Sequence, residues 1–154
     1  MSGFTAAGIA PSTVTTTQQA PLGFELTAPN GDYGLRVWVY IQMTGGAAAQ
    51  GDVIERTNGN SFIGAAGAVA TTKSSCLGVA QHVIAEDSYG FILKSGKGQV
   101  TCDGSVTIGS DIVPAAAADV TDLTAGSEHR VIGLALATDA GAGTQVAAML
   151  DCGT

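Results

Sequence analysis

The last two thirds of the sequence can be aligned with itself. Residues 41–54 match residues 100–113 without a gap, at an offset of 59. The offset is 55 at Leu77–Ala80 and 57 at Ile92–Gly96. Two copies of one unit therefore occupy about 41–96 and 100–153. Because the repeated unit carries no reactive cluster, a structural building block is a better interpretation than a catalyst.

Hydrophobic alternation predicts strands in both copies. In residues 36–43 one face carries Val37, Val39, Ile41 and Met43, and the other carries Arg36, Trp38, Tyr40 and Gln42. Asn58–Gly59 supplies the positive φ values of a tight turn, so residues 52–63 are predicted to form a hairpin. Further short β-branched segments lie at 76–84, 89–93, 98–102, 106–108, 130–137 and 145–150. Short strands at this spacing predict an all-β fold, a barrel or sandwich built from two duplicated halves.

The N-terminal segment, residues 1–30, differs from the rest. No charged residue precedes Glu25, and three prolines interrupt regular structure. The segment is either a solvated tail or an extended arm that orders only against a neighbouring subunit, and its apolar anchors Phe4, Ile9 and Val14 favour the arm. We therefore predict an N-terminal arm over residues 1–30 and a single β domain over residues 31–154.

The composition argues against several classes of partner. Charged residues make up 12% of the chain, against about 25% in an average soluble domain, which suits a surface largely covered by other proteins. A net charge of -7 and six dispersed lysines and arginines argue against nucleic-acid binding. The sequence lacks a run of about 18 apolar residues and a secretory signal pattern, so neither a membrane span nor a leader is predicted.

Patterns for catalysis or metal binding are weak. His82 lies in an apolar segment and His129 in a polar turn, and no metal-binding histidine spacing is present. Cys76, Cys102 and Cys152 are odd in number and lack Cys-x-x-Cys spacing, so we interpret them as reduced core residues of a protein assembled in a cytoplasm. Acidic turn residues lack the spacing of a calcium loop. We expect no catalytic site, no cofactor and no metal.

Several segments occur in an order typical of one family. Leu77–Ala80, Tyr89–Ile92 and the strand Gln99–Thr101 resemble the core of the capsid cement (head decoration) proteins of tailed bacteriophages. In that family a Gly-Val-Ala strand is followed by Tyr-Gly-Trp, and here Phe91 replaces the tryptophan. The segments 32–40 and 131–150 are similar too, so the resemblance spans roughly 30–153. It implies a homotrimer on the outer surface of the virion capsid, where it clamps adjacent major capsid proteins.

The same residues leave two rival functions open. A carbohydrate-binding or adhesin-like β module would need an exposed aromatic platform, for which Tyr33, Trp38 and Tyr40 are the candidates. An enzyme of unknown type is the second rival. In the capsid hypothesis these three aromatic residues, with Phe4, Ile9 and Val14, are the predicted protein interface.

Overall fold

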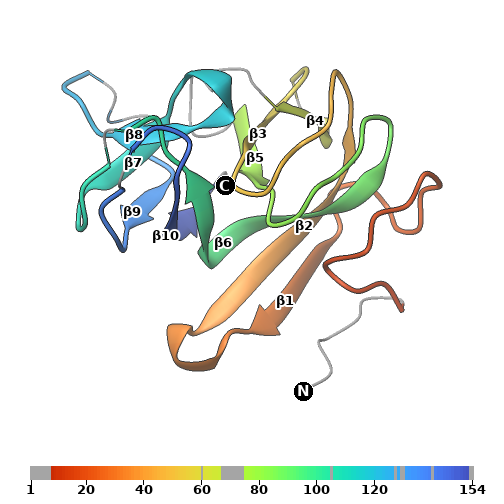
Figure 1. The fold of residues 1–154 in the computed structure, drawn as a ribbon. Helices are drawn as coiled ribbons and strands as arrows, with labels where there is room; N and C mark the ends of the chain where they lie inside the picture. The colour runs from red at the N-terminus through yellow and green to blue at the C-terminus, as the bar shows by residue number, and fades with distance from the viewer. Residues whose placement is uncertain are drawn as a thin grey trace.

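A computed structural model describes residues 8–59, 61–66, 75–104, 106–126, 128, 131–139 and 141–152. These residues form ten strands and contain no α-helix, which confirms the all-β prediction (Figure 1). The strands are β1 (Glu25–Pro29), β2 (Leu35–Met43), β3 (Val53–Arg56), β4 (Ile63–Ala66), β5 (Cys76–Val79), β6 (Tyr89–Thr101), β7 (Asp111–Pro114), β8 (Val120–Asp122), β9 (Gly133–Ala135) and β10 (Gln145–Asp151). Short 3-10 turns lie at Gly31–Tyr33 (η1) and Ala116–Ala118 (η3).

The first copy closes into a small barrel. Its strands follow the order β2-β4-β3-β5-β6, and β6 pairs back with β2. All neighbours are antiparallel except β2 and β4, which run parallel. The predicted hairpin at Asn58–Gly59 joins β3 to β4 and is confirmed. Closure gives each strand of this barrel a partner on both of its edges.

The second copy repeats this ring with β6 as a shared strand. The order β6-β10-β9-β7-β8 is antiparallel at every step. A parallel bridge between Cys102 and Val120 then returns from β8 to the end of β6, where the Asp103 N–H donates to the Val120 carbonyl at 3.1 Å. In Figure 1 the two barrels lie side by side along the long strand β6.

Loop hydrogen bonds confirm that both copies share one topology. The Met43 N–H donates to the Ser88 carbonyl at 2.8 Å, and the Met43 carbonyl accepts from the Asp87 N–H at 3.1 Å. Cys102, 59 positions later, makes the same pair of bonds with Thr144 and Gly143 at 2.9 and 2.7 Å. The two copies therefore agree in their turns as well as in their strands.

The structure corrects the predicted alignment by one residue in two places. Ile54 pairs with Gly78 and Ile112 pairs with the equivalent Gly133, so Ile54 corresponds to Ile112 at an offset of 58 instead of 59. The chain takes 11 positions from Met43 to Ile54, but 10 from Cys102, the equivalent of Met43, to Ile112. Val39 pairs with Ile92, and its equivalent Gly98 pairs with Ala148. Ile92 therefore corresponds to Ala148, at an offset of 56 instead of 57. A slip of one residue exchanges the inner and outer faces of a strand, and the corrected pairs are all buried.

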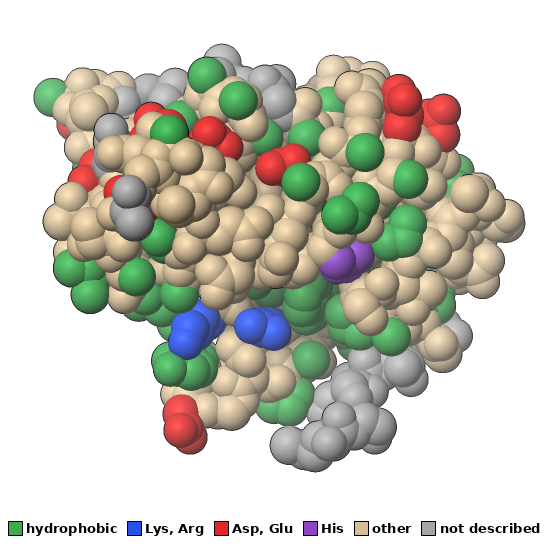
Figure 2. Space-filling view, viewed as in Figure 1, with side chains coloured by type: hydrophobic (Ala, Val, Ile, Leu, Met, Phe, Trp, Pro, Cys, Tyr) green, Lys and Arg blue, Asp and Glu red, His purple; other side chains and the backbone are tan. Residues whose placement is uncertain are grey.

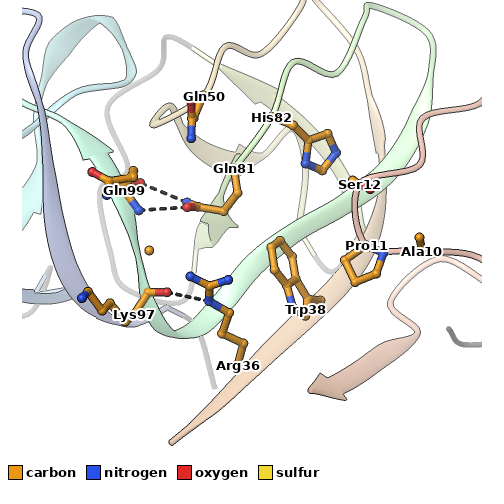
Figure 3. Close-up of a pocket in the computed structure, with 11 residues that line it drawn as sticks. Ala10, Pro11, Ser12, Arg36, Trp38, Gln50, Gln81, His82, Lys97 and Gln99 are labelled. Atoms are coloured by element: carbon orange, nitrogen blue, oxygen red, sulfur yellow. Dashed lines mark hydrogen bonds between the residues drawn. The ribbon is translucent and has the colours of Figure 1, made fainter. Parts of the chain in front are cut away.

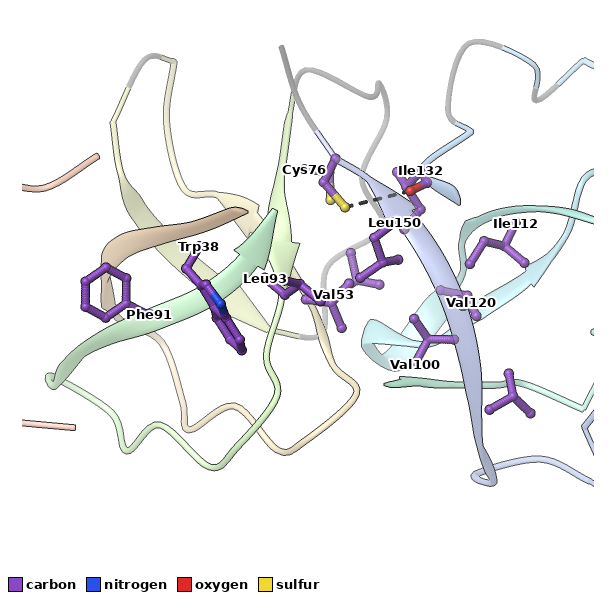
Figure 4. Packing of buried hydrophobic residues seen from close by; sticks show 14 of the residues in the cluster. Trp38, Val53, Cys76, Phe91, Leu93, Val100, Ile112, Val120, Ile132 and Leu150 are labelled. Carbon is purple, nitrogen blue, oxygen red and sulfur yellow. Dashed lines mark hydrogen bonds between the residues drawn. The ribbon is translucent and has the colours of Figure 1, made fainter. Parts of the chain in front are cut away.

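The described residues form two apolar clusters. One lies inside the first barrel and contains Val39, Ile41, Met43, Ile54, Leu77 and Ile92. The other fills the second barrel and continues over the outer face of β2. Figure 4 shows it running from Phe91 and Trp38, past Leu93 and Val53, to Ile112 and Val120. This continuous core joins the two barrels into one unit.

The N-terminal segment packs on its own chain over its described part. Ile9 is 8% exposed and belongs to the larger cluster, with Leu22 and Leu26 packed against it. Thr15 forms an antiparallel bridge with Tyr89. The expectation that this segment orders only against a neighbour is therefore wrong for residues 8–20. The boundary at residue 30 stays a prediction, and β1 within it already belongs to the sheet.

Candidate functional site

The structure buries two of the predicted contact residues. Trp38 is 7% exposed and Tyr40 is 1% exposed. The predicted alternation along β2 is present, but both faces of the strand are covered. One faces the first barrel, and the other shares a cluster with Ile9 and Ala20. Trp38 and Tyr40 thus serve the core, and the idea that they form an exposed contact face is corrected.

Tyr40 also anchors the N-terminal segment through polar and aromatic contacts. Its hydroxyl accepts a hydrogen bond from the Gln19 N–H at 3.0 Å. Its ring lies 5.0 Å from that of Phe91 and 6.3 Å from that of Tyr89, between centroids. A buried tyrosine whose hydroxyl finds a partner stabilises this packing.

The other predicted interface residues have different environments. Val14 is half-buried and packs against the cluster of the first barrel. Tyr33 is 52% exposed, and Phe4 lies outside the described residues. A role in an interface between proteins stays a prediction for all of these positions.

Tyr33 begins an exposed band that mixes apolar side chains with one cation. The Lys97 ammonium lies 3.3 Å from the centroid of the Tyr33 ring, and Leu35 nearby in the chain is 60% exposed. On the outer face of the sheet Lys97 pairs with Met149, which pairs with the exposed Leu134. Neighbouring exposed apolar side chains of this kind suit contact with another protein.

A groove of about 490 Å³ lies between the N-terminal segment and β6. Its walls are Ala10, Pro11, Ser12, Arg36, Trp38, Gln50, Gln81, His82, Lys97, Gly98 and Gln99. Figure 3 shows the Arg36 guanidinium beside the Trp38 ring and below the Gln81 side chain. This volume falls in the range of about 300–1,000 Å³ that is typical of ligand sites.

Side chains satisfy the backbone of β6 along the groove. The Gln81 amide donates to the Gln99 carbonyl at 3.0 Å, and its oxygen accepts from the Gln99 N–H at 2.8 Å. The Arg36 Nε–H donates to the Lys97 carbonyl at 2.7 Å. Gln81 and Arg36 thus occupy positions that a neighbouring strand would otherwise take.

Among the described residues, the groove is lined by basic, neutral polar and apolar ones but by no acidic one. None of its described lining residues is an aspartate or glutamate, although acids outnumber bases in the chain by 13 to 6. Burial lowers the pKa of Arg36 and of His82, because a desolvated cation is disfavoured. The His82 Nε2 atom is buried and has no hydrogen-bond partner among the described residues. In Figure 2 basic side chains gather in the hollow of this face, and acids lie mainly along the upper edge.

The cysteines belong to the core. Cys76, Cys102 and Cys152 are buried free thiols. Burial raises the pKa of Cys102 to about 11, and surrounding aspartates add to the effect. A thiol in this state is a poor nucleophile at neutral pH. Within the described ranges no cluster of three metal-ligating side chains occurs, and no helix is long and apolar enough to cross a membrane.

Comparison with known proteins identifies a relative in fold. No protein-family model and no curated protein sequence matches the chain. The crystal structure of the N base of the head fiber gp8.5 of bacteriophage phi29 is similar, with a TM-score of 0.54 and 14% sequence identity. The similarity covers 75% of this chain and 93% of that one, so nearly all of that base shares this fold.

Proposed function

We propose that the chain is a non-catalytic structural protein of a phage virion that sits on the outer surface of the head, assembled in the host cytoplasm. It binds the major capsid protein there as a homotrimer and stabilises contacts between neighbouring capsid subunits. The observation that carries this proposal is the fold shared with the phi29 head-fiber base over 93% of that chain.

Two features of the molecule support such a role. The duplicated barrels share one strand and one core, so they provide a single rigid unit. The exposed band from Tyr33 and Leu35 to Leu134 offers apolar area for a partner. A protein that binds only the assembled shell stabilises it by mass action, and the effect adds up over many sites.

The carbohydrate-binding alternative loses most of its platform. Of the three aromatic candidates, Trp38 and Tyr40 are buried and Tyr33 alone is exposed. The Tyr33 ring is also occupied on one side by Lys97. A sugar would find a single partly covered ring, which is a weak stacking surface.

Sedimentation with phage heads tests the proposal. Tagged protein is produced during infection, and intact heads are purified through a density gradient. The expected result is a fixed molar ratio of the tagged chain to the major capsid protein, together with a trimeric mass for the free protein in solution. A chain found only in the soluble fraction would contradict a structural role in the virion. If the chain is found in whole virions but stays with the tails when heads and tails are separated, attachment to the capsid is wrong while a role in the virion stands.

A further inference from the structure

Strand β1 has no counterpart among the described residues of the second barrel. In the first barrel β1 pairs with Leu35–Val39 of β2. At the offset of 59 the equivalent positions are 94–98 of β6, and β2 covers the matching edge of β6 only as far as Ser95. The β2 backbone at Leu35 and Arg36 still lies against Gly96. No described strand pairs with Lys97–Gln99 on this edge, because β10 lies on the opposite one. The groove lies along this vacant position.

Side chains now hold the vacant edge. Arg36 bonds the Lys97 carbonyl, and Gln81 bonds both backbone groups of Gln99. Long side chains can rotate away without unfolding the sheet, whereas a paired strand cannot. A strand edge with removable partners is suited to accept an added strand.

The charge of the groove selects the kind of segment that fits. The Arg36 guanidinium is half-buried, and its two terminal amino groups have no carboxylate partner among the described residues. A partly desolvated guanidinium is stabilised by a carboxylate, which it binds through two parallel hydrogen bonds. Strand β1 itself sets a precedent, since its Glu25 carboxylate lies 2.6 Å from the Lys94 ammonium of β6.

We propose that this groove binds a short, extended, acidic peptide segment of a partner protein. The segment adds to β6 along Lys97–Gln99, displaces the Gln81 amide from Gln99, and places an aspartate or glutamate carboxylate on the Arg36 guanidinium. The Trp38 ring and Ser12 form the wall against its side chains. Binding depends only on the geometry and charge of the groove and is independent of the role in the virion.

A titration followed by amide NMR tests this binding. The probe is acetyl-Thr-Val-Glu-Val-Thr-amide, and the matched control peptide has glutamine in place of glutamate. We expect saturable shifts at the Lys97, Gly98 and Gln99 amides and at the Trp38 indole, with the glutamine peptide binding about tenfold more weakly, as expected for a charge-assisted pair. Arg36→Gln should weaken the glutamate peptide by a similar factor and remove the difference between the two peptides.

Two further variants separate binding from folding. Arg56→Gln makes the same change at a guanidinium outside the groove and should leave the affinity unchanged. Ser12→Trp fills the groove from an exposed position and should abolish the shifts while the remaining spectrum stays native. The proposal is overturned if the groove amides do not respond to millimolar peptide, or if Arg36→Gln binds both peptides as the unchanged chain does. Equal binding of free glutamate would also overturn it, because the groove would then hold small carboxylates without a strand.

Discussion

Gly78 of β5 and Gly133 of β9 occupy the same position in the two barrels. A Cβ atom on Gly78 would lie 2.6 Å from the Leu93 carbonyl oxygen, and one on Gly133 would overlap the Met149 carbonyl oxygen. Leu93 and Met149 are themselves equivalent in the pairing of the two copies. The duplication has thus kept a close backbone approach that only glycine allows.

Alanine at either of these glycines should destabilise the fold. For Gly78→Ala and Gly133→Ala we expect a loss of about 1–3 kcal/mol each in the free energy of unfolding, because the new methyl group meets backbone that cannot move aside. Urea denaturation measures the loss. Gly126→Ala is the control, since nothing lies within 4 Å of its Cβ and only the strain of its φ of +89° remains, about 1 kcal/mol. Equal losses in all three variants would show that the close contact is not the cause.

The sequence predicted the duplication because both copies keep the same hydrophobic segments and turns. It did not predict the register, because the alignment joined Asp52 to Asp111, whereas the strand pairing shifts by one residue. Identical turn residues guide an alignment, but the length of a loop decides which face of the next strand is buried.

The sequence pattern predicted two separate strands, at 89–93 and 98–102, where the structure has the single strand β6. Residues 94–98 read Lys-Ser-Gly-Lys-Gly and lack β-branched side chains. In the structure residues 95–98 pair with β10, the Lys94 carbonyl accepts a hydrogen bond from the Cys152 N–H at 2.8 Å, and Gly96 has a φ of +107° where Leu35 approaches. Partners distant in sequence keep the strand continuous, so local preference alone could not reveal it.

The candidate site was the hardest part to predict. Alternation correctly placed Arg36, Trp38 and Tyr40 on one face of β2, but the segment that covers this face, from Ile9 to Ala20, belongs to the predicted arm. The groove residues Gln81 and Gln99 gave no signal, because a glutamine beside a strand resembles any surface glutamine. An arginine on the same face as a tryptophan was the available sign of a polar pocket beside the core.

Ile9 should contribute to the stability of the isolated chain. For Ile9→Ala we expect a loss of about 2–4 kcal/mol in the free energy of unfolding, since a nearly buried side chain would leave a cavity. Ile108→Ala is the matched control, because Ile108 is 63% exposed and should change stability little. Deletion of residues 2–20 should lower the melting temperature for the same reason. Unchanged melting of the deletion variant would show that the segment does not pack on its own barrel in solution.

The three cysteines should react only after unfolding. In native protein at pH 8 a thiol reagent should modify fewer than one thiol per chain within minutes, because all three are buried and the pKa of Cys102 is raised to about 11. In denaturant without reductant the count should reach three. A count of one in denaturant would indicate a disulfide between two of them, and rapid native labelling would indicate an open barrel.

Asp119 should make the fold less stable at neutral pH than at mildly acidic pH. Its pKa is raised by burial and by the neighbouring carboxylates of Asp52 and Asp103, so the folded state disfavours the charged form. Stability linked to this group is present below the ordinary carboxyl pKa of about 4 and is lost as the pH rises through the higher folded value. Asp119→Asn should therefore stabilise the protein in urea at pH 7, by less than about 1 kcal/mol for a half-buried side chain, and the gain should vanish near pH 4.

Glu86→Gln at an exposed turn is the control that changes net charge equally. A gain at pH 7 that persists at pH 4, or that Glu86→Gln reproduces in full, would assign the effect to something other than the local repulsion around Asp119.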